Sequence, residues 1–157
     1  MRIGRRVAFD IGKARIGVAV SDAHGILASP RDFIPRNPDI SETISAITNL
    51  IASEEPLEVY IGLPVNLKNQ PTESTTDAIE LARKLQGVIS QTVRLIDERM
   101  TTRIASSAMA SAGKSSRQQR GSIDSAAAAV ILETALGFEK STGQEPGITI
   151  GDYEIGK

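Results

Sequence analysis

Apolar residues along the chain follow two periods, and these periods predict the order of its elements. Short runs of mainly apolar residues that end at Gly or Pro predict strands, and apolar residues that recur every three or four positions predict helices. The predicted strands are residues 5–12, 15–22, 26–34, 57–64 and 92–96. The predicted helices are residues 41–54, with Ser41 as N-cap, then 76–85, 101–112, and a last helix from about residue 122.

The spacing of these elements predicts an α/β fold. Short gaps between the first three strands favour an antiparallel meander, whereas helices between the later strands favour parallel crossovers. We therefore expect a mixed five-stranded sheet, with strands four and five parallel to strand one and helices on its faces. After Phe138 the composition shifts to EKSTGQEPG, which predicts one domain over residues 1–138 and a flexible tail over residues 139–157.

Composition excludes several classes of protein. The 157 residues include no Cys, so disulfides, thiolate metal sites and a Cys nucleophile are excluded. No apolar run is long enough to span a membrane, and Asp10 and Lys13 interrupt the segment that follows the basic start MRIGRR. These features predict a cytoplasmic protein with no membrane partner.

The net charge of −1 argues against a dedicated nucleic-acid binder, but the charge is unevenly distributed. Two segments, residues 1–15 and 99–120, are strongly basic. Their basic residues are Arg2, Arg5, Arg6, Lys13, Arg15, Arg99, Arg103, Lys114, Arg117 and Arg120, and Asp10 is the only acid in either segment. The two segments are either solvated surface or a site for a polyanion.

Three acids occupy positions that the predicted fold would bring together. Asp10 ends the first strand, Glu98 follows the fifth, and Asp124 lies in the first turn of the last helix. The carboxyl ends of parallel strands meet at one edge of a sheet, where ligand sites form. Three carboxylates there would suit Mg²⁺ or Mn²⁺, and two such ions about 3.5–4 Å apart promote phosphodiester hydrolysis.

Each acid also has a simpler explanation. Asp124 could stabilise the helix start through the helix dipole, and Asp10 could be a turn residue. Asp97 or Glu98 could form a surface ion pair with Arg99 or Arg103. The single His, His24, lies beside Gly25 in a predicted turn, and one His cannot supply a two-His zinc site.

The stretch LIDERMTT, residues 95–102, places Asp97 and Glu98 side by side where the fifth strand ends. Side chains alternate along a strand, so Asp97 would share a face with Val93 and Leu95, and Glu98 would share the opposite face with Ile96. Periodicity does not choose which of the two acids binds metal.

Four segments resemble the signature blocks of the YqgF family, also called RuvX. They are FDIGKARIGVAVSD (9–22), VYIGLPVN (59–66), IDERMTT (96–102) and SIDSAAAAVIL (122–132). Members are RuvC-like proteins of the ribonuclease H-like fold, described as candidate pre-16S rRNA nucleases or candidate Holliday junction resolvases. The resemblance implies Asp10, Glu98 and Asp124 as catalytic metal ligands for Mg²⁺ or Mn²⁺.

The resemblance and the basic segments together predict a set of nucleic-acid contacts. Arg99, Thr101 and Thr102 belong to the D-E-R-x-T-T block, for which the resemblance implies a supporting or phosphate-contacting role. The basic segments add Lys13, Arg15, Arg103, Lys114, Arg117 and Arg120, several of them in the polar loop of residues 113–121.

We expect a metal-dependent nuclease that processes the 5′ end of pre-16S rRNA. One alternative is a junction resolvase for branched DNA, which would need a symmetric dimer, so both a monomer and a homodimer stay open. A second is a non-catalytic RNA-binding factor for ribosome assembly. A third, an actin-like ATPase, would need two such domains to enclose ATP.

Overall fold

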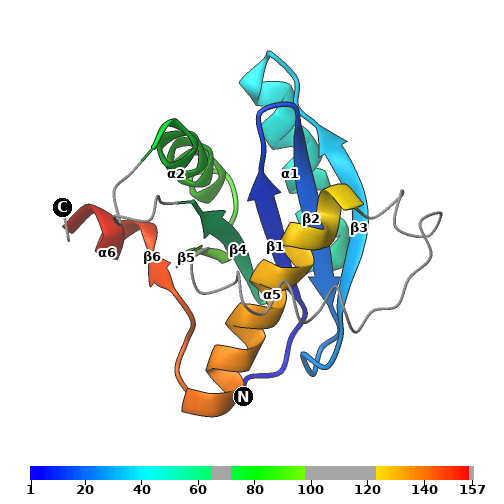
Figure 1. Ribbon diagram of the computed structural model, residues 1–157, viewed down its shortest axis with the longest axis vertical. Helices are drawn as coiled ribbons and strands as arrows, with labels where there is room; N and C mark the ends of the chain where they lie inside the picture. The colour runs from blue at the N-terminus through cyan, green and yellow to red at the C-terminus, as the bar shows by residue number, and fades with distance from the viewer. Residues whose placement is uncertain (65–71, 98–122, 156–157) are drawn as a thin grey trace.

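A single mixed β-sheet forms the centre of the protein (Figure 1). The computed structural model describes residues 1–64, 72–97 and 123–155. The strands are β1 (Arg6–Ile11), β2 (Arg15–Ser21), β3 (Ala28–Pro35), β4 (Glu58–Leu63), β5 (Thr92–Asp97) and β6 (Ile148–Thr149). The helices are α1 (Ile40–Glu54), α2 (Glu73–Gln86), α5 (Ile123–Thr142) and α6 (Ile150–Ile155).

The sheet has the strand order β3-β2-β1-β4-β5-β6. The first three strands pair antiparallel, β1, β4 and β5 pair parallel, and β6 pairs antiparallel with β5. The predicted meander and the two strands parallel to the first are therefore confirmed. The structure adds a sixth strand at the edge.

The helix starts are fixed by capping side chains. Asp39, rather than the predicted Ser41, caps α1 by accepting a hydrogen bond from the Ser41 amide at 3.0 Å. Thr72 and Thr75 form a capping box at the start of α2. Because Thr72 caps α2, this helix begins before the predicted residue 76. The predicted helix of residues 101–112 and the polar loop of residues 113–121 lie outside the described residues.

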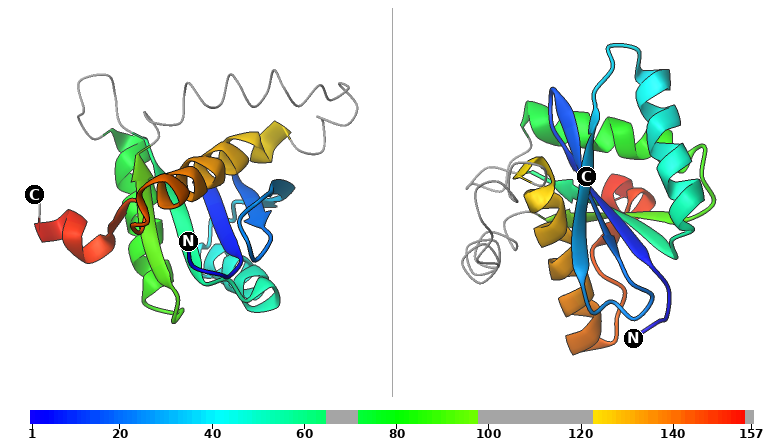
Figure 2. Two further views of the ribbon diagram at one scale, coloured as in Figure 1. Left: turned by 90° about the horizontal axis from the view of Figure 1, so that it is seen from below. Right: turned by 90° about the vertical axis from the view of Figure 1, so that its right-hand side faces the viewer.

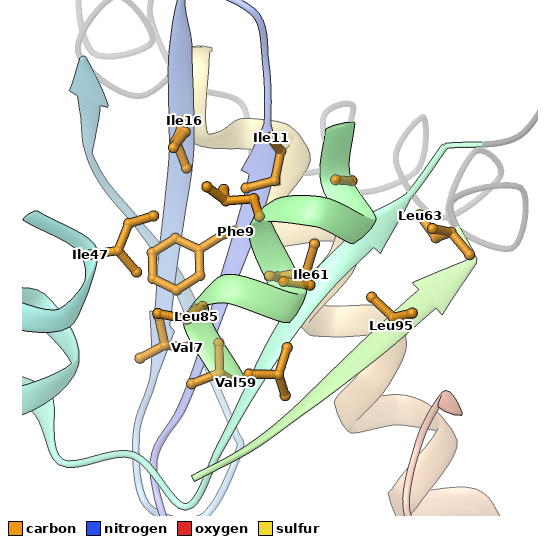
Figure 3. Packing of buried hydrophobic residues seen from close by; sticks show 14 of the residues in the cluster. Val7, Phe9, Ile11, Ile16, Ile47, Val59, Ile61, Leu63, Leu85 and Leu95 are labelled. Atoms are coloured by element: carbon orange, nitrogen blue, oxygen red, sulfur yellow. The ribbon is translucent and has the colours of Figure 1, made fainter. Parts of the chain in front are cut away.

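Helices cover both faces of the sheet (Figure 2). On one face α1 and α2 pack against alternate residues of the central strands; Figure 3 shows Phe9 and Ile61 packed with Ile47 and Leu85. On the other face α5 packs against Ala8 and its neighbours. Because side chains alternate along a strand, Asp10 lies on the α5 face.

The predicted loose tail beyond Phe138 is wrong for residues 139–155. The helix α5 continues to Thr142, and β6 then pairs with Arg94 and Leu95 of β5. Gly147 makes this return possible: its φ of 66° is left-handed, and a Cβ there would collide with the Leu95 carbonyl oxygen. A strand of two residues is too short to leave a periodic signal, so composition alone suggested disorder.

No helix among the described residues is long and apolar enough to cross a membrane.

Candidate active site

Asp10 lies near the carboxyl end of β1, partly exposed, on the face that α5 covers. Its cross-strand partner on β2 is Gly17, which contributes no side chain. On the other side of β1, the pair of Phe9 with Ile61 places Gly62 of β4 level with Asp10. Asp10 therefore stands in a row of the sheet where the flanking strands present glycine.

The carboxyl ends of β4 and β5 reach the same edge of the sheet. Leu63 pairs with Asp97, the last residue of β5. Val93 and Leu95 pack in the α1/α2 cluster, whereas Ile96 packs in the α5 cluster. Alternation therefore assigns Asp97 to the α1/α2 face, away from Asp10. Glu98 lies outside the described residues, so its assignment as a ligand stays a prediction.

Ser125 holds the first turn of α5 onto the sheet beside Asp10. Its fully buried side chain accepts a hydrogen bond from the Val18 amide at 3.0 Å and donates one to the Arg31 carbonyl at 2.5 Å. Val18 directly follows Gly17, the partner of Asp10. The helix therefore begins over β2 and β3, next to the carboxyl end of β1 (Figure 1).

The backbone thus places two of the three predicted acids, Asp10 and Asp124, at one corner of the fold. Asp124 is the residue before Ser125 and lies in the first turn of α5. Its side chain is outside the description. Among the described residues, no group of three or more His, Cys, Asp or Glu side chains could hold a metal ion. The predicted metal site therefore stays a prediction that the backbone geometry favours.

The hairpin after Asp10 is tight and adjoins a polar hollow. The Gly12 amide donates to the Arg15 carbonyl at 3.1 Å, and a Cβ at Gly12 would stand 2.6 Å from that oxygen, so only glycine fits. The hollow of about 330 Å³ is lined by Ile11, Gly12, Lys13, Arg36, Glu73, Ser74 and Asp77.

Arg36 fixes one wall of this hollow. Its guanidinium donates to both Asp77 carboxylate oxygens, at 2.5 and 2.6 Å, and to the Gly12 carbonyl at 3.0 Å. The hydrogen bonds to Asp77 raise the pKa of Arg36. Such a fork-shaped contact is rigid, so Arg36 ties α2 to the hairpin that follows Asp10.

Two of the nine predicted nucleic-acid contacts lie in the described residues. Lys13 and Arg15 are both exposed at the β1–β2 hairpin, on the edge of the sheet where β1 ends. The Arg15 guanidinium carbon lies 5.1 Å from the centre of the Phe33 ring. Arg99, Thr101, Thr102, Arg103, Lys114, Arg117 and Arg120 lie outside the description. The role of all nine in binding stays a prediction.

A buried ionic network lies at the opposite end of the same sheet face, and sequence reasoning missed it. The Glu58 carboxylate accepts hydrogen bonds from Arg2 at 2.7 Å and Arg94 at 2.5 Å, and the Tyr60 hydroxyl donates to it at 3.1 Å. Burial raises the pKa of Glu58, but the hydrogen bonds from the two arginines outweigh burial and hold it below its ordinary value.

The network also anchors the far end of α5. Glu139 is buried and accepts hydrogen bonds from the Arg2 amide, the Arg2 guanidinium and Arg6, at 3.0, 2.6 and 3.2 Å. Burial raises the pKa of Glu139, while these contacts lower it to a net value below the ordinary one. The helix is therefore fixed near its start by Ser125 and near its end by Glu139. The one available sequence signal was the charge of Arg6 and Glu58 at the start of apolar strands.

This fold places an acid at the end of the first strand of a mixed sheet, beneath the start of a helix that crosses the sheet. The structure is similar to that of Thermus thermophilus RuvC in complex with a Holliday junction substrate, with a TM-score of 0.66 and 12% sequence identity, covering 90% of this chain and 98% of RuvC. This likeness shows a RuvC-like, ribonuclease H-like fold, as predicted.

The chain belongs to the RuvX family. The family's sequence model, described as a Holliday junction resolvase, matches residues 4–137. A relative from Clavibacter michiganensis, named a candidate pre-16S rRNA nuclease, is 41% identical over 150 residues, which are 96% of this chain and 93% of the relative. A relative of the same name from Streptomyces coelicolor is 42% identical over 148 residues, 94% of this chain and 88% of the relative. The resemblance found in the four sequence blocks is therefore confirmed.

Proposed function

We propose that the protein is a metal-dependent nuclease that hydrolyses phosphodiester bonds. The observation that carries the proposal is the pair of Ser125 hydrogen bonds, to the Val18 amide and the Arg31 carbonyl, because they bring the start of α5 beside Asp10. Membership of a family described as resolvases, with relatives named as nucleases, supports the same reaction class.

The residues at this corner suit hard divalent cations. Asp10 supplies carboxylate oxygens from a partly exposed position between Gly17 and the level of Gly62. Asp124 and Glu98 would complete an all-oxygen ligand set for Mg²⁺ or Mn²⁺. Two bound cations of this type supply an activated water and stabilise the leaving oxygen.

The remaining contribution of the chain is positioning. The Ser125 contacts and the Glu139 network hold α5 at both ends, so the distance between Asp124 and Asp10 is set by the sheet rather than by a loop. The exposed Lys13 and Arg15 stand at the same edge and would contact substrate phosphates.

We propose pre-16S rRNA, cut at its 5′ end, as the substrate. The names of the relatives from Clavibacter and Streptomyces support this choice. A substrate of this kind implies a cytoplasmic protein and a role in ribosome biogenesis.

The family description and the junction-bound RuvC favour a second candidate, resolution of four-way DNA junctions. Paired cuts in a junction need two sites related by two-fold symmetry, hence a homodimer, whereas single cuts in RNA need only a monomer. A third candidate, a non-catalytic assembly factor, would bind precursor RNA without cutting it.

One experiment separates these functions. The unaltered protein, Asp10→Asn and the control Asp152→Asn are incubated with Mg²⁺ or Mn²⁺ on 5′-extended 16S precursor RNA and, in parallel, on a four-way DNA junction. Asp152 is an exposed acid on α6, so its variant controls for the loss of one carboxylate. We expect cleavage of the RNA that Asp10→Asn abolishes and Asp152→Asn retains. Cleavage of the junction alone would favour the resolvase, and no Asp10-dependent cleavage of either substrate would refute the nuclease.

A further inference from the structure

Phe33 is an exposed aromatic residue on the edge strand β3, close to the candidate active site. We propose that Phe33 and Arg15 form a stacking platform for an unpaired base of the substrate strand. This inference rests on the proposed nuclease function and adds a contact with a base, whereas the other predicted contacts are with phosphates.

The register of the sheet puts Phe33 in the same row as Asp10. Ile16 pairs with Ile34 and Val18 pairs with Arg31, so Asp32 and Phe33 together face the single residue Gly17 across a β-bulge. Gly17 in turn pairs with Asp10 on β1. Phe33 is therefore two strand spacings from Asp10, roughly 10 Å along the row. Bulges of this kind re-aim side chains and are frequent beside active sites.

Phe33 and Asp10 also lie on the same face of the sheet. Ile34 packs against the α1/α2 cluster, so its neighbour Phe33 lies on the opposite face, the face of Asp10. Arg15 lies over the Phe33 ring and is therefore on that face as well. The start of α5 stands beside the pair, because Ser125 binds the carbonyl of Arg31, two residues before Phe33.

The pair has the chemistry that unpaired bases recognise. Aromatic rings and arginine guanidinium planes both stack on bases, and an arginine beside the ring adds a positive charge for the backbone. Phe33 is 38% exposed. Of the other four aromatic residues, Phe9 and Tyr60 are buried, and Phe138 and Tyr153 are only partly exposed. Phe33 is thus the most exposed of the five aromatic residues, all of which lie in the described part of the chain.

The simpler explanation is that Phe33 and Arg15 only cover each other on an edge strand. If the pair is purely structural, mutating Phe33 should change the stability of the protein but not its affinity for single-stranded RNA. The two explanations therefore differ in a measurable property, which is the contact between residue 33 and a base.

The protein has no Trp, so Phe33→Trp creates a single fluorescent reporter at the platform. The substitution is made in an Asp10→Asn background, which binds without cutting. The probe is a single-stranded RNA oligonucleotide from the 5′-extended 16S precursor. The matched control is Val88→Trp, because Val88 is 60% exposed and precedes β5, at the opposite end of the strands from Asp10.

We expect the RNA to quench the fluorescence of the Phe33→Trp variant and to leave that of the Val88→Trp variant unchanged. A fully paired duplex of the same sequence should quench neither. In the same background, Phe33→Ala should raise the dissociation constant for the single strand about 5- to 150-fold, the range for loss of one stacked base. Phe33→Tyr keeps an aromatic ring and should bind the single strand as the parent does. Arg15→Lys should weaken binding while keeping the charge, because an ammonium does not stack.

Equal responses of the two fluorescent variants, or Phe33→Ala binding as tightly as the parent, would overturn the platform. The result is independent of the nuclease proposal, because binding is read in a variant that does not cut. Stacking at residue 33 without Asp10-dependent cleavage by the unaltered protein would refute the nuclease and leave the platform standing. Asp10-dependent cleavage with no stacking at residue 33 would refute the platform and leave the nuclease standing.

Discussion

Ser125→Ala tests whether the start of α5 is positioned by one hydroxyl group. The substitution removes the acceptor of the Val18 amide and the donor to the Arg31 carbonyl, and it changes nothing else in the helix. Alanine is also a better helix former than serine, so the helix itself is not weakened.

The magnitude follows from the two groups that lose a partner. Val18 is fully buried, so its amide is left unsatisfied in an interior position. Arg31 is exposed, and water can replace the serine at its carbonyl. One unsatisfied buried group costs about 1–3 kcal/mol, which should lower the melting temperature by about 2–4 °C for each kcal/mol in a domain of this size.

The effect on catalysis should exceed the effect on stability. If Asp124 and Asp10 act on the same phosphodiester, a shift of about 1 Å in the helix start can cost about 100-fold in rate. We therefore expect the single-turnover cleavage rate on the precursor RNA to fall by about 10- to 100-fold at a temperature where the variant is fully folded. Rates are measured under single turnover, and folding is followed by circular dichroism.

Ser141→Ala is the matched control, because Ser141 lies on the same helix and its exposed hydroxyl donates to the local Phe138 carbonyl. It should change neither the cleavage rate nor the melting temperature. If Ser125→Ala is destabilised by the expected amount but cuts RNA at the unaltered rate, the proposed role of the α5 start in catalysis is wrong.

Three further outcomes concern stability, each measured by urea denaturation. Glu58→Gln should lower the free energy of unfolding by about 1.5–3 kcal/mol because Arg2 and Arg94 lose a buried charged partner while keeping Glu139 and Glu145, whereas Glu154→Gln, which breaks an exposed pair with Arg83, should cost less than about 1 kcal/mol; equal costs would show that the network is not buried in solution. The pKa values of Glu58 and Glu139 lie below the ordinary value. The two carboxylates should therefore stabilise the fold fully above about pH 4.3, and this stabilisation should be lost as the pH falls through their folded-state pKa values. A urea midpoint that does not change with pH in this acidic range would contradict the expected loss. Thr134→Val should stabilise by about 1 kcal/mol, since the buried Thr134 hydroxyl has no hydrogen-bond partner among the described residues, and Thr43→Val should destabilise, since the Thr43 hydroxyl bonds the Asn37 backbone; two changes of the same sign would refute this distinction.

The order of the central elements could be predicted because each carries a local signal. Short runs of mainly apolar residues mark β1 and β2, and the Gly12 hairpin fixes their antiparallel pairing. The helix boundaries were less accurate, because Asp39 and Thr72 both compete with nearby Ser and Thr residues as caps. Such competition is decided by backbone geometry, which a pattern of residue types does not contain.

The features that the sequence did not reveal depend on contacts between distant residues. Arg6 and Glu139 are 133 positions apart, and nothing in either neighbourhood indicates the other. The role of Ser125 is similar, since its partners Val18 and Arg31 belong to the first strands. The family blocks predicted the acids, whereas the hydroxyl that fixes the start of α5 was recognisable only from its contacts.

We propose that Asp10 and Asp124 bind the same cation at the carboxyl edge of the sheet. The most direct test is calorimetric titration with Mn²⁺ of the unaltered protein, Asp10→Asn, Asp124→Asn, the double variant and the control Asp152→Asn. We predict that each single variant loses most of the binding that the unaltered protein and the control show. The double variant should lose little more, with a coupling free energy of about 0.5–3 kcal/mol as expected for groups with a common partner. Additive losses, or Mn²⁺ binding that neither substitution changes, would contradict the shared site.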